Sequence, residues 1–219
     1  MNYYCMISAE KEMLYMSKKE KLTDVVFILD RSGSMCGTEK DTIGGYNSYI
    51  EDFRKKNARI TTVLFDNKYE MITKRQNVNE VSELTEKEYF VRGGTALLDA
   101  IGQSIKFMEE EKAGKVIFII TTDGYENASK EFNKSQIKEM IQGHKEWEFM
   151  YIGADIDSYS EGESIGIRKS NISNYKKDST GISKMFKAMS LATEDYCCKD
   201  CVDSSWKEDL EDYMEKNCS

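Results

Sequence analysis

Short apolar runs alternate with helical patterns along most of the chain. Runs rich in β-branched and aromatic residues predict strands at 24–30, 58–66, 68–78, 115–124, 148–155 and 171–177. Apolar side chains at helical spacing predict helices at 38–56, 95–114, 134–144, 158–165, 181–192 and 204–217. This alternation is typical of an α/β protein.

The order of these elements predicts a doubly wound, mostly parallel sheet with helices on both faces. Strands 58–66 and 68–78 are nearly contiguous, so we expect a hairpin that makes one edge strand antiparallel. Strand 171–177 is expected at an edge as the last strand. Crossovers between parallel strands are right-handed, which brings the carboxyl ends of these strands to one edge, where such folds bind ligands.

Composition narrows the class of protein. The 219 residues fit one domain, which we place at 24–193, between an N-terminal extension, 1–23, and a cysteine-containing tail with a predicted helix, 194–219. The net charge of -8 disfavours nucleic acid as a partner. No apolar run is long enough for a membrane span, and the N-terminus does not read as a signal peptide. We therefore expect a cytoplasmic protein with reduced thiols.

Polar side chains follow two of the buried strands and precede the clearest helix. Asp30, Ser32 and Ser34 come after the first strand in "VVFILDRSGSM", and Asp123 closes the most apolar strand in "KVIFIITTDG". Thr95 follows two glycines at the start of the helix. In a doubly wound sheet these three loops share the carboxyl edge, so the five side chains are expected to converge.

All five side chains offer oxygen and none offers nitrogen or sulfur. Oxygen ligands are those that Mg²⁺ prefers, and two carboxylates balance a divalent charge. Each piece alone is more simply structural: "GGT" reads as a turn with a helix cap, and "DG" as a turn. Together, in this order and strand context, they predict a metal site.

The three motifs "DRSGSM", "GGT" and "TTDG" resemble the metal-ion-dependent adhesion site (MIDAS) of the von Willebrand factor A domain family, whose fold is Rossmann-like. The family pattern, D-x-S-x-S followed by a distant Thr and a distant Asp, is complete here. Its positions are Asp30, Ser32, Ser34, Thr95 and Asp123. The resemblance covers about residues 24–193.

The resemblance implies a role for each position. Ser32 and Ser34 would coordinate Mg²⁺ or Mn²⁺ directly, and Asp30 would act through a bound water or as an anchor behind the ligands. Thr95 and Asp123 would exchange direct and water-mediated contact between states. The open coordination position would accept a Glu or Asp side chain of a partner protein. Gly44 and Gly45, in the first helix, are interpreted as easing packing against the metal loop.

Enzymatic alternatives fit the residues less well. A phosphotransfer Asp of the haloacid-dehalogenase type wants a second carboxylate two residues on, where Ser32 stands. A serine nucleophile would need a Gly-x-Ser-x-Gly elbow, which this loop lacks. The single histidine, His144, reads as a solvated residue at a helix end. We therefore expect no enzyme, and we keep a metal-dependent phosphoester or ester hydrolase as the alternative.

The tail cysteines raise a second metal hypothesis. Cys198 and Cys201 have the C-x-x-C spacing of zinc ligands, with Cys197 and Cys218 as the remaining thiols. The second pair lacks that spacing, so free thiols are the simpler interpretation.

The sequence thus predicts a Mg²⁺-dependent protein-binding module. A structural subunit whose metal only joins three loops remains a further alternative. The oligomeric state and the identity of the partner are left open.

Overall fold

The computed structural model describes residues 22–217. Six strands form one sheet in the order β3-β2-β1-β4-β5-β6. They are β1 (Thr23–Asp30), β2 (Ala58–Phe65), β3 (Tyr69–Asn77), β4 (Lys115–Thr122), β5 (Glu148–Gly153) and β6 (Ile172–Asn174). Every neighbouring pair is parallel except β2 and β3. The predicted α/β class and its antiparallel edge strand are confirmed.

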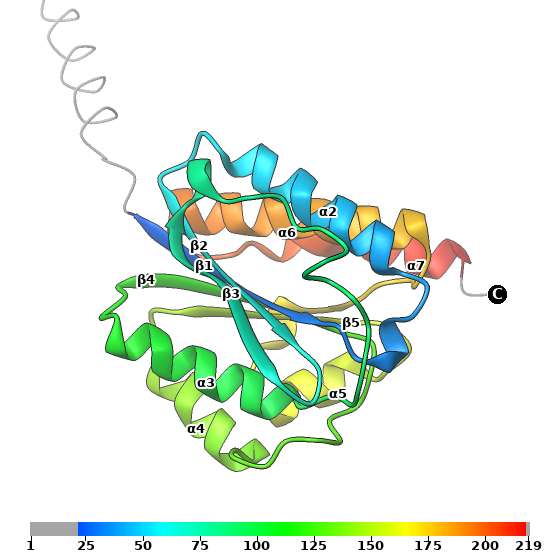
Figure 1. Cartoon of the computed structure of the whole chain (residues 1–219). Coiled ribbons are helices and arrows are strands. Elements are labelled where there is room, and N and C mark those ends of the chain that lie inside the picture. Colours follow the sequence, from blue (N-terminus) through cyan, green and yellow to red (C-terminus); the bar gives the residue numbers. More distant parts are fainter. Residues whose placement is uncertain (1–21, 218–219) are drawn as a thin grey trace, which may run out of the picture.

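Helices cover both faces of the sheet (Figure 1). One face carries α2 (Glu39–Phe53), α6 (Ser179–Lys199) and α7 (Glu208–Asn217), and the other carries α3 (Leu97–Glu110), α4 (Lys134–Gly143) and α5 (Ser158–Ser164). Short 3-10 segments are η1 (Gly33–Met35), η2 (Val78–Glu80), η3 (Lys169–Asn171) and η4 (Ser204–Lys207). Within residues 22–217, no helix combines the length and apolar character needed to cross a bilayer.

The central strand β1 explains why the apolar runs are continuous rather than alternating. All eight of its residues are buried. Val25 and Phe27 belong to the core beneath α2 and α6, whereas Val26 and Ile28 belong to the core beneath α3 and α4. A strand covered on both faces favours apolar side chains on both of its sides, and the polar residues of β1, Thr23, Asp24 and Asp30, lie at its two ends.

Many element boundaries differ from the prediction by a few residues, and two of these differences concern the elements β6 and α6. The last strand ends at Asn174 instead of continuing to residue 177, so residues 175–178 form a loop before α6. Helix α6 continues to Lys199, beyond the predicted end at residue 192, because Tyr196 and Cys197 extend its buried stripe.

The segment after α6 packs onto the core. Trp206 and Leu210 are buried in the same cluster as α6, and the Lys207 ammonium donates to the carbonyl of Ile172 in β6. Of the predicted N-terminal extension, residues 1–21 lie outside the described residues, and Thr23 already belongs to β1.

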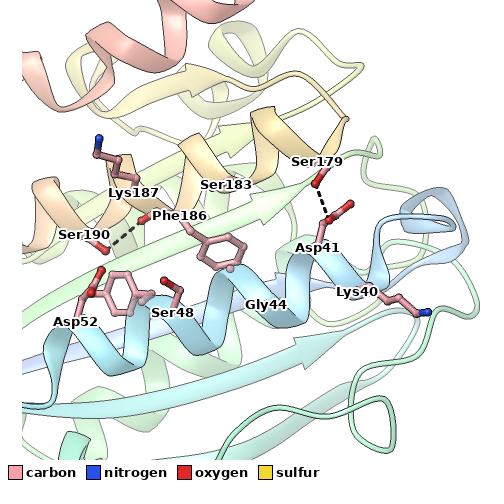
Figure 2. Close-up of a pocket in the computed structure, with 12 residues that line it drawn as sticks. Lys40, Asp41, Gly44, Ser48, Asp52, Ser179, Ser183, Phe186, Lys187 and Ser190 are labelled. Carbon is pink, nitrogen blue, oxygen red and sulfur yellow. Dashed lines mark hydrogen bonds between the residues drawn. The ribbon is translucent and has the colours of Figure 1, made fainter.

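A groove of about 470 Å³ separates part of α2 from α6 (Figure 2). A Cβ added to Gly45 would lie 2.1 Å from the ring of Phe186, so this glycine lets α6 approach α2. A Cβ on Gly44 would meet nothing within 4 Å. The interpretation that these glycines ease packing against the metal loop is therefore wrong for Gly45, which packs against α6.

Candidate metal centre

Asp30 is the last residue of β1, and its side chain is fully buried. Its Oδ1 accepts a hydrogen bond of 2.6 Å from the amide of Ser32, and its Oδ2 accepts one of 2.6 Å from the Thr122 hydroxyl. The carboxylate thus joins the loop after β1 to the end of β4.

Burial makes the charge of Asp30 unfavourable. Desolvation raises the pKa of its carboxyl from 3.8 to about 6, although the hydrogen bonds from Thr122 and Ser32 act in the opposite direction. The negative charge of Asp123 raises this pKa further. A cation placed among these oxygens would favour the ionised form.

Two serine hydroxyls connect the loop after β1 with the loop after β4. The Ser32 and Ser34 hydroxyl oxygens are 2.9 Å apart, and the Ser34 hydroxyl donates to Oδ1 of Asp123 at 2.5 Å. Ser32 and Asp123 are buried, whereas Ser34 is exposed. The result is a chain of oxygen atoms that begins at β1, ends at β4 and is open to solvent at one side.

Thr95 reaches the same point from a third loop. A Cβ built on Gly124 would lie 3.0 Å from the Thr95 hydroxyl oxygen and 3.1 Å from that of Ser34, so both hydroxyls face the space that the missing side chain leaves. Gly93 has a φ of +70°, which L side chains rarely adopt, and the turn before Thr95 depends on it. The structure thus brings together the five residues predicted from sequence.

Thr95 does not serve as the N-terminal cap of helix α3. The N-cap of α3 is Ala96, and it makes no side-chain cap. The first amides of the helix are instead satisfied from the loop after β4, because Leu98 donates to the Glu126 carboxylate and Asp99 donates to the Ser129 hydroxyl. The cap expected of a threonine at this position is therefore supplied by other residues.

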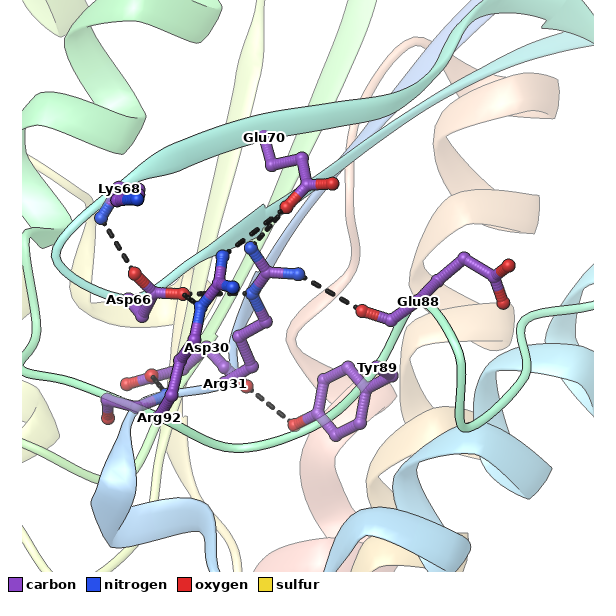
Figure 3. Close-up of polar contacts among 9 residues, drawn as sticks. Asp30, Arg31, Asp66, Lys68, Glu70, Glu88, Tyr89 and Arg92 are labelled. Atoms are coloured by element: carbon purple, nitrogen blue, oxygen red, sulfur yellow. Dashed lines mark hydrogen bonds and ion pairs between the residues drawn. The ribbon is translucent and has the colours of Figure 1, made fainter.

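A buried arginine fixes the loop that carries Thr95 (Figure 3). Arg31 donates from Nε to Asp66 at 3.0 Å and from Nη1 to the carbonyl of Glu88 at 3.0 Å, and Arg92 donates to the same Asp66 oxygen at 2.8 Å. The Tyr89 hydroxyl donates to the carbonyl of Asp30 at 2.6 Å. These contacts tie the segment before Thr95 to the loop after β1.

Sequence reasoning missed this arrangement. Arg31 occupies the variable position of the D-x-S motif, and nothing in the pattern marks it as buried. The connection is also made by backbone, since Arg92 donates to the carbonyl of Arg31 at 2.9 Å and Gly33 donates to that of Gly93 at 3.1 Å.

Lys177 is a second residue that the sequence did not reveal. Its ammonium lies 2.8 Å from Oδ2 of Asp123 and donates to the carbonyl of Ser34 at 2.5 Å. It was assigned to the last strand, but the strand ends three residues earlier. Because β6 is parallel, the loop that follows it lies at the carboxyl edge with the candidate ligands.

The other candidates lie apart from this centre. His144 pairs with Glu109 and stacks on Trp147 near the amino ends of β4 and β5. Cys197 is buried, whereas Cys198 and Cys201 are exposed. In the part of the chain that the structure describes, no cluster of three or more His, Cys, Asp or Glu side chains could hold a metal. Cys218 lies outside it, so the zinc site stays a prediction.

The chemistry of the converging side chains fits a small divalent cation. Three hydroxyls and two carboxylates supply only oxygen, and the glycine at position 124 leaves room beside two of the hydroxyls. One carboxylate, Asp30, is buried where a nearby positive charge would stabilise it.

Solved structures share this architecture, although no protein-family model and no curated protein matches the sequence. A von Willebrand factor type A structure from Catenulispora acidiphila aligns with a TM-score of 0.58 at 15% identity, over 80% of this chain and 43% of that one. The chain has the fold of a von Willebrand factor type A domain. At this level of identity the likeness extends to the fold alone.

Two further solved structures are similar in fold to this chain. Proximal thread matrix protein 1 from the mussel byssus has a TM-score of 0.58 at 14% identity, over 77% of this chain and 45% of that one. It has also been solved with a zinc-occupied MIDAS motif. The PilB minor pilin of Streptococcus sanguinis has a TM-score of 0.60 at 11% identity, over 79% and 61%. The chain spans less than two thirds of each of these structures.

Proposed function

We propose that this chain is a metal-dependent protein-binding module that captures an acidic side chain of a partner. The observation that carries the proposal is the chain of oxygen atoms from Ser32 through Ser34 to Asp123, with the Thr95 hydroxyl directed at the same point. Its position at the carboxyl edge of a von Willebrand factor type A fold agrees with this role.

Each side chain has a distinct role in the proposal. Ser32 and Ser34 hold Mg²⁺ or Mn²⁺ through their hydroxyls, while Asp30 keeps their loop in place. Thr95 and Asp123 complete the ligand set. When bound, the ion supplies a positive charge with a coordination position for a carboxylate. Ser34 is exposed, so a partner can reach that position from solvent.

Metal-dependent hydrolysis is the second candidate function, and it has less support. A hydrolase would need a base near the metal to activate water. His144 sits at the amino ends of β4 and β5, paired with Glu109, and does not serve that role. We therefore propose binding, with no turnover, as the activity of this edge.

Ser34→Ala tests the proposal because it removes one hydroxyl and leaves the buried anchor intact. Mg²⁺ is expected to raise the melting temperature of the wild type over that in EDTA, and not that of the variant. Ser183→Ala, on the exposed face of α6, is the matched control and should respond like the wild type. Identical wild-type melting in Mg²⁺ and in EDTA would contradict the metal claim.

Partner capture separates the remaining alternatives. Immobilised wild type in Mg²⁺ should retain a protein that both EDTA and Ser34→Ala release. Turnover of phosphoester or ester substrates with Mn²⁺, lost in Ser34→Ala, would favour a hydrolase. Retention of the partner in EDTA, together with a lower melting temperature, would favour a metal that only stabilises the loops.

A further inference from the structure

Lys177 places a positive charge within the candidate metal centre. The loop between β6 and α6 returns to the carboxyl edge and carries this side chain to Asp123, 2.8 Å away, and to the carbonyl of Ser34. The Lys177 side chain is 22% exposed, whereas that of Asp123 is fully buried. The ion pair therefore forms at the boundary between the buried ligands and solvent.

The contacts of Lys177 involve the atoms that a metal would need. Oδ1 of Asp123 accepts from the Ser34 hydroxyl, whereas the buried Oδ2 has no hydrogen-bond partner among the described residues and lies in an ion pair with the ammonium. In this arrangement the charge of Asp123 is already neutralised from within the chain. A divalent ion must then either displace the ammonium or bind beside it, and both lower the affinity of the site.

The backbone of this loop is held in place, and the Lys177 side chain is the part that can move. Asp178 caps α6 by accepting from the amide of Gly181 at 2.7 Å. A Cβ on Gly181 would lie 2.0 Å from the carbonyl oxygen of Lys176, so the loop packs directly on the helix start. Because the lysine side chain is flexible and its backbone is fixed, the ammonium can leave Asp123 and return without a movement of the loop.

We infer that Lys177 is a built-in competitor of the divalent ion for Asp123, and that it sets the ion concentration at which the site becomes able to bind a partner. The inference rests on the proposed function, since it requires that the site bind a divalent ion. It adds a residue outside the five-residue pattern to the control of that site.

The neighbouring lysine provides a matched control. Lys176 has the same charge in the same loop, but its ammonium contacts the carbonyl of Asn217 at 3.1 Å and lies 3.6 Å from Asp178. Lys177→Met and Lys176→Met therefore change the net charge equally. Only the first removes a cation from Asp123.

Isothermal titration with Mg²⁺ and with Mn²⁺ measures the effect directly. Lys177→Met is expected to bind the ion roughly tenfold more tightly than the wild type, a coupling of ordinary size. Lys176→Met and the charge-preserving Lys177→Arg should bind it as the wild type does. Melting in EDTA checks that each variant is folded, and Lys177→Gln provides a second neutral variant if Lys177→Met is not.

The outcomes separate this inference from the proposed function. Equal affinity in the wild type and both neutral variants, or weaker binding in those variants, would overturn the inference and leave the proposed function standing. Failure of every protein to bind either ion would overturn both.

Discussion

Asp30 is a carboxyl group held where its charge is disfavoured, and the consequence is a pH dependence. Its pKa is raised from 3.8 to about 6 in the folded protein, mainly by burial. The folded state then binds the proton more tightly than the unfolded state does. The stability that this group contributes without metal is present below about pH 4 and is lost as the pH rises through about 6.

Melting of the wild type and Asp30→Asn in EDTA between pH 4 and pH 7 measures this contribution. The melting temperature of the wild type minus that of Asp30→Asn is expected to fall as the pH rises across that window. In Mg²⁺ above pH 6 this difference should instead rise with pH, because the ion stabilises the ionised carboxylate of the wild type. A difference that does not change with pH would show that the pKa of Asp30 is not raised in the folded protein.

Residues differ in how far the sequence reveals them. Asp30, Ser32, Ser34, Thr95 and Asp123 could be brought together in advance because chain order and the shared carboxyl edge of parallel strands fix where their loops lie. Arg31 and Lys177 could not. Arg31 lies between two motif positions and Lys177 lies far from all of them in the sequence, and each acquires its partner only through the packing of distant segments. Charge type alone does not indicate which of two adjacent lysines points inward.

At the scale of elements, the segment before α3 depends on one buried carboxylate. Asp66 lies after β2 and accepts from both Arg31 and Arg92, and the amide of Ala96 donates to its carbonyl at 2.8 Å. The Arg31 and Asp66 side chains are almost fully buried. Asp66 is the only buried carboxylate paired with Arg31 among the described residues, since Glu70 is half exposed, so removing Asp66 leaves a buried charge only partly compensated.

Asp66→Ala is expected to lower the free energy of unfolding by about 3 kcal/mol, because the buried Arg31 then keeps only the half-exposed Glu70 as an ion-pair partner. Asp209→Ala removes the exposed carboxylate that pairs with Lys184 and should lower it far less, because exposed ion pairs contribute little to stability. Urea denaturation of both variants makes the comparison. Equal losses would show that the Arg31 cluster is not a stabilising element.

Element boundaries were less predictable than element types, and Tyr175 shows why. Its side chain is buried, and its amide still donates to the carbonyl of Gly153 at 2.8 Å, so the apolar pattern continues past the end of β6. The pattern of buried side chains does not reveal where regular backbone pairing between two strands ends. The same limit concealed the loop that carries Lys177.

For the whole molecule, the C-terminal segment contributes to the core that supports the sheet. Leu210 of α7 is fully buried and belongs to the cluster shared by α2 and α6. Leu210→Ala is expected to lower the free energy of unfolding by about 2–5 kcal/mol. Glu208→Ala, an exposed change in the same helix, should alter it by less than about 0.5 kcal/mol. Chemical denaturation that does not distinguish the two would contradict the packing of α7.

The two outer strands have a consequence for how another protein can attach. β6 has only three residues, and β3 pairs with β2 through two register shifts, with Arg75 at a φ of +41° and bound to Asp24 through two bonds of 2.9 Å. A short strand and an irregular, charged one are poor templates for adding a strand from another chain. Sheet extension is thereby disfavoured at both sides, which agrees with the proposal that a partner binds through the loops at the ends of the parallel strands.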